Sequence, residues 1–511
     1  MVRTLTILAG LAAATLAAAT PAQAQKSKDT LRFPLPESQF AMDVYSMAVR
    51  GNFSQAWAPS VYDTLLGFDA KTGEFVGHLA KTWAQTDPTT YEFELRNDIK
   101  FHDGQPLGAD DVVHTLNYLI DPKTKLRFKS TWSWVKSVEK LGPHKVRITA
   151  KQPVPGGMMF MAYGWPIYPK HIHAGLADPE LFGTRPVGTG PYRVLKIDKN
   201  SGVLAEKYAG YVASRVKPAA SIGRVIAEPI PDSGTQVAAL LTGRADVVED
   251  LPTDQAAALA KDGRFEVTLS PPGLGYTFLG FPSLGANRVK ALGDERVRTA
   301  IVKAIDRKAL VEVQLGASGA AIAPAEALCL KEELGCGYTK PIADHDPAGA
   351  RKLLAEAGYG DGFDLTISCF FNTVAEATAI SGMLRAVGIR AAVAPHQVPL
   401  RRQMLAQGKI EMSYYGWTGV MFEVAPHVDR HFLTKEFDDP ALVKLAEATL
   451  TITDDTERRK KVAQVFDYAV DKAYALPMVP NRSVYTHTKE VKITVPDVRL
   501  ISVNPHDFAW K

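Results

Sequence analysis

Cysteine, catalytic motifs and metal-ligand patterns are scarce in this chain of 511 residues. The three cysteines form no CxxC pair, which argues against a cysteine-ligated zinc site. Walker A, G-x-G-x-x-G, HExxH and G-x-S-x-G patterns are missing, so the common signatures of nucleotide-binding proteins, zinc proteases and serine hydrolases are not met. His171 and His173 would share one face if they lay on a strand, but we expect a surface or packing role for them, and neither a metal nor a cofactor.

An excess of charge of one sign and long apolar runs are also missing from most of the chain. Lys and Arg number 59 against 55 Asp and Glu, a net charge of +4, so no nucleic-acid partner is predicted. The apolar run from Leu5 to Ala19 follows Arg3 and precedes Ala22-Gln23-Ala24, which is the pattern of a secretory signal peptide over residues 1–24. The run is shorter than the roughly 20 apolar residues that span a bilayer. We expect a periplasmic mature chain that begins near Gln25, without a membrane span or lipid anchor.

Two of the cysteines are close together in a loop-like segment. Cys329 and Cys336 bound the sequence CLKEELGC. Because an exported protein enters an oxidising compartment, we expect a disulfide that closes this loop. Cys369 lies in an apolar strand pattern, and we expect it to be a buried free thiol.

The size and the alternation of patterns predict a multi-lobed α/β protein. Removing residues 1–24 from 511 leaves 487, more than a single hydrophobic core usually supports. Tyr91, Phe93 and Leu95 alternate with polar residues as in a half-buried strand. Asp346-Pro347 and Asp439-Pro440 each place a capping carboxylate before a proline at the first helical position. Strands and helices alternate in this way through the chain.

Residues 61–118 carry an ordered string of short motifs. They are Tyr62-Asp63-Thr64-Leu65-Leu66, Leu79-Ala80-Lys81-Thr82-Trp83, Phe93-Glu94-Leu95-Arg96, Phe101-His102-Asp103-Gly104 and Ala109-Asp110-Asp111-Val112-Val113. The string resembles the signature region of the family 5 solute-binding proteins, the receptors of peptide- and nickel-type ABC importers. The resemblance implies a protein that binds a solute and hands it on without chemistry.

Further pieces of the resemblance follow in order through the mature chain. They are Pro186–Tyr192 (PVGTGPY), Gly243–Val247 (GRADV), Arg296–Arg307, Leu353–Tyr359 (LLAEAGY) and Leu476–Pro480 (LPMVP). The resemblance implies a two-lobed α/β clamshell of the periplasmic-binding-protein type, with an extra subdomain in the first lobe. It places the discontinuous first lobe at 25–60, 185–270 and 482–511, the subdomain at 61–184, and the second lobe at 271–481.

Two of these motifs have a structural interpretation. In GTGPY, Gly188 and Gly190 permit unusual backbone angles and Pro191 fixes the turn. In FHDG, Asp103 is expected to cap backbone donors. We expect both motifs to be scaffold and not to contact the solute.

The resemblance points to Gly416-Trp417-Thr418 as the start of a loop that lines the solute cleft. In peptide-binding relatives, an acidic residue three positions after this Trp pairs with the peptide α-amino group. Here that position is Val420, and a buried ammonium without a counter-charge is costly. Two interpretations stay open. Either Glu423 supplies the carboxylate from a reshaped loop, or the solute has no ammonium to neutralise.

Aromatic side chains supply further candidate contacts. Tyr414 and Tyr415 precede the Trp on a strand, so alternation should send one to the cleft and the other to packing. Tyr276 and Phe278 lie in GYTFLGF, where the chain should cross between the lobes. Core packing is the alternative for each of these residues.

The remaining candidates lie in two other segments. The segment from Leu31 to Tyr45 enters the first lobe and could supply Phe40 or Tyr45 to the cleft. Arg401 and Arg402 lie on an expected helix, either on its solvated face or with one guanidinium holding a solute carboxylate.

We therefore expect a monomeric receptor that binds a peptide or another small organic solute between its lobes and delivers it to an inner-membrane permease. Organic acids, opines, sugars and metal chelates are alternative cargoes. A secreted hydrolase is the alternative of a different class, and turnover of a bound solute would distinguish it from a receptor.

Overall fold

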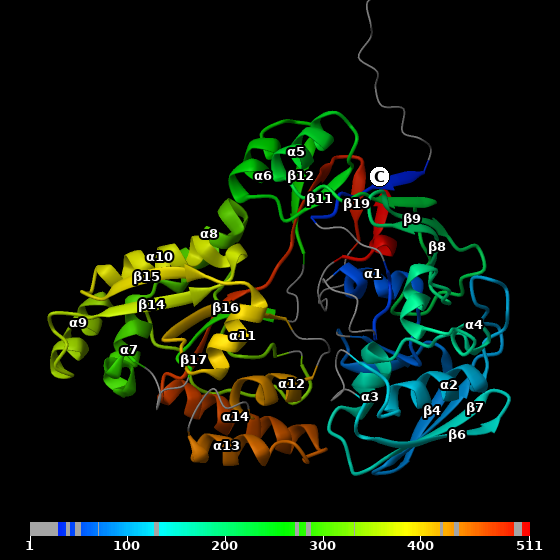
Figure 1. The fold of residues 1–511 in the computed structure, drawn as a ribbon, viewed down its shortest axis with the longest axis horizontal. Helices are drawn as coiled ribbons and strands as arrows, with labels where there is room; N and C mark the ends of the chain where they lie inside the picture. The colour runs from blue at the N-terminus through cyan, green and yellow to red at the C-terminus, as the bar shows by residue number, and fades with distance from the viewer. Residues whose placement is uncertain are drawn as a thin grey trace, which may run out of the picture.

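The computed structural model describes residues 29–36, 41–45, 53–69, 71–126, 132–270, 275–282, 288–331, 333–418, 423–433, 439–494 and 503–511. Figure 1 shows two bodies of helices and strands side by side. We call the body with β1–β12 and β18–β20 the first lobe, and the body with β13–β17 the second lobe. The fold is thus the expected two-lobed α/β fold, whereas the residue boundaries of the lobes stay predictions.

The first lobe is built on two mixed or antiparallel sheets and a short terminal pair. The four-stranded sheet has the order β1 (Thr30–Arg32), β10 (Arg224–Ala227), β9 (Gly202–Lys207), β8 (Tyr192–Asp198). The three-stranded sheet has the order β11 (Val247–Glu249), β18 (Val484–Thr488), β12 (Phe265–Leu269), and β19 (Val491–Ile493) pairs with β20 (Phe508–Trp510). Its helices are α1 (Phe53–Val61), α5 (Ser233–Leu241) and α6 (Thr253–Ala260).

Residues 66–184 add a second group of elements to this lobe. Their antiparallel sheet has the order β4 (Ala80–Asp87), β5 (Thr90–Leu95), β7 (Lys145–Ala150), β6 (Val135–Gly142), and β2 (Leu66–Asp69) pairs with β3 (Glu74–Gly77). The helical segments are α2 (Ala109–Ile120), α3 (Gly157–Met159), η2 (Phe160–Gly164), α4 (Lys170–His173) and η3 (Pro179–Thr184). Tyr91, Phe93 and Leu95 of β5 are buried, as their alternation predicted.

The second lobe holds a five-stranded sheet between two sets of helices. The strand order is β15 (Arg390–Pro395), β14 (Asp364–Cys369), β16 (Met412–Thr418), β13 (Gly275–Gly280), β17 (Ala475–Pro480). One hydrophobic cluster includes residues of α7 (Glu295–Ala304), α8 (Arg307–Leu315), α9 (Pro347–Glu356) and α10 (Val374–Arg385). Another includes residues of α12 (Ala425–Val428), η7 (Asp429–Leu433), α13 (Pro440–Glu447) and α14 (Asp455–Asp471). The other segments are α11 (Val398–Ala406), η4 (Lys290–Gly293), η5 (Gly316–Gly319) and η6 (Phe371–Thr373).

The N-terminal caps of two of these helices are those that the sequence predicts. Asp346 accepts a hydrogen bond from the backbone of Gly349 at the start of α9, and Pro347 is the first helical residue. Asp439 caps α13 in the same way, with Pro440 next. Cys369 at the end of β14 is buried and unpaired, as expected. Among the described residues, no helix is both long and apolar enough to cross a bilayer.

Two chain segments that cross between the lobes are braced against each other. The N–H of Ser270 donates to the carbonyl of Ser483 at 2.8 Å, and that of Asn481 donates to the carbonyl of Gly275 at 2.9 Å. Arg482 donates through Nη1 to the carbonyl of Ser270 at 3.0 Å. In Figure 1 the red coil that follows β17 runs from the second lobe to the first, where β18 lies between β11 and β12. These crossings join the two lobes.

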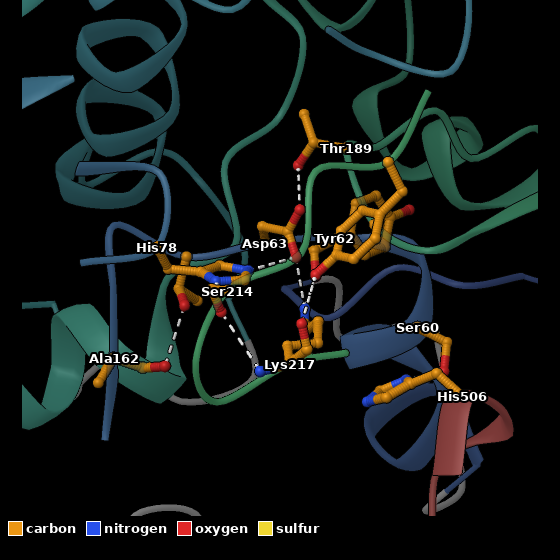
Figure 2. A network of polar contacts seen from close by, with 12 residues as sticks. Ser60, Tyr62, Asp63, His78, Ala162, Thr189, Ser214, Lys217 and His506 are labelled. Atoms are coloured by element: carbon orange, nitrogen blue, oxygen red, sulfur yellow. Dashed lines mark hydrogen bonds and ion pairs between the residues drawn. The ribbon is translucent and has the colours of Figure 1, made fainter. Parts of the chain in front are cut away.

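A buried carboxylate ties the first-lobe motifs together. Asp63 of the YDTLL motif binds His78 Nε2 at 2.7 Å, Lys217 Nζ at 2.5 Å and the Thr189 hydroxyl of GTGPY at 2.8 Å (Figure 2). Charge and hydrogen bonds from Lys217 and His78 hold the pKa of Asp63 well below its usual range, although burial alone would raise it. The motif therefore joins three separate stretches of the chain.

The GTGPY and FHDG motifs also contact each other in the scaffold. The His102 ring lies 2.9 Å from the carbonyl of Gly190 and accepts the N–H of Gly188 at 3.2 Å. The expectation of unusual backbone angles at Gly188 and Gly190 is wrong, because neither has a positive φ. Close approach is the reason for glycine, since a Cβ on Gly188 would lie 2.0 Å from the carbonyl oxygen of Val61.

The two clustered histidines of the first lobe lie on a short helix, α4, and not on a strand. His171 pairs with Asp103 at 2.6 Å, and Asp103 also accepts the N–H of Gln105 at 3.1 Å. His173 lies 2.9 Å from His114. In the part of the chain that the structure describes, no group of three or more His, Cys, Asp or Glu side chains could hold a metal ion.

Candidate functional site

Four of the predicted site aromatics lie on one side of the second-lobe sheet. Strands β13 and β16 are antiparallel neighbours, and their register pairs Tyr276 with Trp417 and Phe278 with Tyr415. Directly paired residues point to the same side of a sheet. We call these four side chains the aromatic face. Tyr414, the alternate residue on β16, packs in the cluster on the opposite side, as the period of two predicted.

The aromatic face contacts two histidines that sequence reasoning missed. His427 of α12 and His431 of η7 are buried, and the His431 ring centroid lies 4.5 Å from that of Phe278. The Trp417 ring lies 5.7 Å from His427 and 5.8 Å from His431. Their spacing of four residues, which puts both on one side of a helical turn, was the signal available in the sequence.

The hydroxyl of Tyr276 is at the centre of this cluster. It donates to the carbonyl of Leu328 at 2.6 Å and lies 3.0 Å from His427 Nδ1 and 3.1 Å from His431 Nε2. A hydroxyl carries one hydrogen, so with that hydrogen on Leu328 it can only accept from the rings. Burial raises the pKa of Tyr276 well above its usual range. Tyr276, Phe278 and Tyr415 are at most 3% exposed, so their aromatic mass also packs the core.

Glu423 lies inside the protein and already has a cationic partner. Its Oε1 is 3.0 Å from Nη1 of Arg458, with exposures of 0% and 3%, and it accepts the N–H of Ala425. Burial raises the pKa of Glu423 to about 7, with Arg458 opposing the shift. A Cβ on Gly156 of the first lobe would lie 2.2 Å from Glu423 Oε2. Glu423 therefore lies where the two lobes touch.

The loop between the two paired cysteines contributes to the same contact. Cys329 and Cys336 form a disulfide with a Cα separation of 5.9 Å. Leu330 and Leu334 of this loop pack against the hydrophobic core of the first lobe, and Leu334 bridges to Glu423 as an isolated β pair. The loop belongs to the second lobe but reaches across to the first.

The neighbouring α14 helix holds this loop in place. Arg459 donates to the carbonyls of Glu333 and Cys336 at 3.1 and 2.7 Å. Asp455 accepts the N–H of Gly335 at 2.6 Å. Glu333 itself lies 2.9 Å from Nε2 of His427, with both side chains fully buried.

The remaining predicted positions are placed as follows. Arg401 is 3% exposed, so the solvated-face interpretation fails for this residue. Tyr45 is buried in the first lobe, where its hydroxyl donates to the carbonyl of Pro166 at 2.6 Å. Phe40 and Val420 lie outside the described residues, as do the side chains of Thr418 and Arg402. The backbone of Thr418 pairs with Gly275 at the end of β16.

One polar arrangement in Figure 2 resembles the chain of groups that activates a nucleophile. The hydroxyl of Ser214 lies 2.7 Å from His78 Nδ1, and His78 Nε2 lies 2.7 Å from Asp63. The Asp63 carboxylate is shared with Lys217 and Thr189, and Ser214 also accepts the N–H of Lys217 at 3.2 Å. These contacts tie the arrangement into the scaffold, and the hydroxyl is engaged on both sides.

Comparison with known proteins places this geometry in a family. Residues 74–439 match the model of the bacterial extracellular solute-binding proteins, family 5 Middle. The chain is 28% identical to the glutathione-binding protein GsiB of Salmonella choleraesuis (strain SC-B67), covering 95% of this chain and 94% of the relative.

Solved structures share the fold over nearly the whole chain. NikA from Brucella suis in complex with Fe(III)-EDTA has a TM-score of 0.82 at 22% identity, covering 94% of this chain and 100% of NikA. DppA from Helicobacter pylori in complex with peptide STSA has a TM-score of 0.74 at 22% identity, covering 94% of this chain and 98% of DppA. The chain belongs to family 5 of the bacterial extracellular solute-binding proteins and is the solute-binding component of an ABC importer.

Proposed function

We propose that the protein captures a short peptide between its lobes, with glutathione the first candidate, and delivers it unaltered to an inner-membrane permease. The observation that carries the proposal is the aromatic face, which lies at the strands next to the lobe crossings and contacts His427 of α12, the helix that begins two residues after Glu423. The identity to a glutathione-binding relative over 95% of the chain supports the choice of solute. We propose a monomer that acts in the periplasm after removal of residues 1–24.

The mechanism follows from the braced crossings. Asn481 links them to the site, because its side-chain amide donates to the carbonyl of Trp417 at 3.1 Å. A solute that contacts both lobes binds the closed form more tightly than the open one and shifts the population toward closure. The closed form would then present one surface to the permease.

Of the two interpretations of the solute amine, we favour the one in which Glu423 does not neutralise it. The carboxylate already pairs with Arg458, and both side chains are nearly inaccessible to solvent. Recruiting Glu423 for an ammonium would take from the buried guanidinium its buried partner and leave it the more exposed Asp455. The solute is then either free of an ammonium or neutralises it by other means.

The test is a thermal-shift screen of the mature chain after unfolding, removal of copurified ligand and refolding. The panel holds glutathione, di- to pentapeptides, amino acids, nickel with histidine, oligosaccharides and small organic acids. A solute at a hundred times its Kd should add roughly 2.7 kcal/mol of stability. A clear shift with glutathione or peptides supports the proposal. Shifts restricted to non-peptide solutes would contradict the peptide cargo but not the function as a solute receptor.

A hydrolase is the second candidate, and the Ser214–His78 contact is the observation that favours it. Mass spectrometry of the solute recovered after overnight incubation decides between the two. Intact solute in stoichiometric amounts supports the receptor. Cleavage of the solute by wild type, together with intact solute after incubation with Ser214→Ala, would establish the hydrolase.

A further inference from the structure

A single arginine side chain is buried above the aromatic face. Arg401 lies on α11 and is 3% exposed. Its guanidinium carbon is 3.7 Å from the ring centroid of Tyr415 and 5.8 Å from that of Phe370. Stacking on aromatic rings holds a guanidinium by its flat faces and leaves the N–H groups at its edge available for hydrogen bonds.

Two of the three guanidinium nitrogens of Arg401 have no acceptor among the described residues. Nε and Nη2 of Arg401 are shielded from solvent and meet no hydrogen-bond partner among the described residues. The other buried arginines of the second lobe are satisfied differently. Arg298 donates to backbone carbonyls, including that of Leu292 at 2.9 Å. Nε of Arg458 also meets no hydrogen-bond acceptor among the described residues, but Arg458 has Glu423 and Asp455 as counter-charges. A buried cation without a counter-charge is unfavourable unless something binds to it.

A second unpaired donor lies on the same face. The indole Nε1 of Trp417 is buried and meets no hydrogen-bond acceptor in the part of the chain that the structure describes. Trp417 and Tyr415, over which Arg401 stacks, are alternate residues of β16 and project to the same side. Both unpaired groups are donors and one is cationic, so the group that would satisfy them is an anionic acceptor.

We propose that Arg401 is a specificity-determining residue that binds a carboxylate of the solute, with Trp417 as an additional donor. The inference rests on the proposed function and narrows its substrate class to solutes with a free carboxylate. The planar guanidinium can donate two parallel hydrogen bonds to the two oxygens of a carboxylate. An amide or an ester lacks the negative charge that strengthens these bonds. A carboxylate would also compensate the buried charge, which meets no counter-charge among the residues that the structure describes.

Two large apolar side chains next to this stack in the sequence are exposed. Phe371 and Leu400, the chain neighbours of Phe370 and Arg401, are 59% and 47% exposed. Large apolar side chains that stay open to solvent beside a buried charge are typical of the border of a ligand site. The expected solute therefore presents a carboxylate next to an apolar or neutral portion.

The experiment is a double comparison of protein and solute. Calorimetry measures the affinity of wild type and Arg401→Met for three pairs of probes that differ in carboxylate charge: glutathione and its diethyl ester, Ser-Thr-Ser-Ala and its C-terminal amide, and glutarate and glutaramide. The control Arg390→Met removes an arginine that pairs with Asp364 on the exposed edge of the same sheet. Unfolding midpoints without solute are recorded for all variants.

The proposal predicts that wild type binds at least one acid better than its uncharged partner, and that Arg401→Met weakens that acid roughly 30-fold or more. The uncharged partner should change less than about threefold in the same variant, and Arg390→Met should change neither. The midpoint of solute-free Arg401→Met should stay the same or rise, because an uncompensated buried charge has been removed.

Other outcomes overturn one claim or the other. If only glutarate binds, the peptide proposal fails while the carboxylate inference stands. If no acid binds better than its partner, or if Arg401→Met weakens acid and uncharged partner equally with a lower solute-free midpoint, Arg401 is a structural residue and the inference is wrong.

Discussion

Three carboxylates lie at points where separate parts of the chain or the two lobes meet. Asp63 is paired with Lys217 and His78, whereas Glu423 is paired with Arg458. Asp250, beside the lobe crossing, accepts the N–H of Val484 at 2.8 Å. Each of these groups has a shifted pKa, and the direction of the shift decides how it acts on stability.

Glu423→Gln separates the two interpretations of this residue. If the carboxylate serves Arg458, the substitution leaves the buried guanidinium with Asp455, 3.3 Å from its Nη2, as its remaining counter-charge, and lowers the free energy of unfolding by about 3 kcal/mol. Urea denaturation of the solute-free chain measures this change. An unchanged denaturation midpoint together with a steep loss of peptide affinity would instead show that Glu423 neutralises the solute amine.

Asp250→Asn tests the pH dependence of the lobe crossing. Burial and the neighbouring Glu249 raise the pKa of Asp250 well above the ordinary value of roughly 3.9. At pH values between the ordinary pKa and the raised pKa, Asp250 holds a proton in the folded state that it has lost in the unfolded state. The free energy of unfolding therefore falls as the pH rises. The substitution removes this penalty and keeps an acceptor for the backbone of Val484, and asparagine tolerates the left-handed φ of 55° at this position.

We therefore expect Asp250→Asn to gain stability relative to wild type as the pH is raised from acid to neutral, and to show little difference near the ordinary pKa of Asp. Urea denaturation over a pH series gives the comparison. A constant difference at all pH values would contradict a raised pKa.

At the scale of the element, the disulfide loop makes contacts with both lobes. Cys329→Ser combined with Cys336→Ser removes a constraint on a short loop, and we expect a loss of about 2 kcal/mol in the free energy of unfolding. Because Leu330 and Leu334 of the loop pack on the first lobe, solute affinity should fall as well. Each single substitution should lower the free energy of unfolding as much as the double substitution does. A double variant with unchanged stability would contradict a structural role for the disulfide.

How far the sequence predicts an element depends on the range of the interactions that define it. The alternation of Tyr414 and Tyr415 is a local property of a strand, so their opposite orientations were predictable. The pairing of β13 with β16 joins residues far apart in the chain, and neither the contact of Tyr276 with His427 nor that of Glu423 with Arg458 follows from spacing. The need for glycine at position 188 was predicted, but its cause, a neighbouring backbone, was visible only in three dimensions.

At the scale of the whole molecule, the contact between the lobes includes a glycine of the first lobe. Gly156 has φ +67° and lies against Glu423 of the second lobe. Gly156→Val should hold the lobes apart, increase the radius of gyration in solution scattering and weaken solute binding. Gly104→Val is the matched control, because Gly104 also has a positive φ, +88°, but no atom within 4 Å of a built Cβ. Equal scattering curves for the two variants would show that backbone strain, and not contact between lobes, causes any loss.

The position of β18 between β11 and β12 has a consequence for the order in which the protein folds. This central strand follows the whole second lobe in the chain, so its two neighbours are synthesised long before it and have nothing between them until then. The second-lobe sheet, by contrast, is complete once β17 has emerged. We expect the second lobe to acquire its native core first and the first lobe to finish last, which makes the unfinished edges of β11 and β12 the segments most in need of protection before the chain is complete.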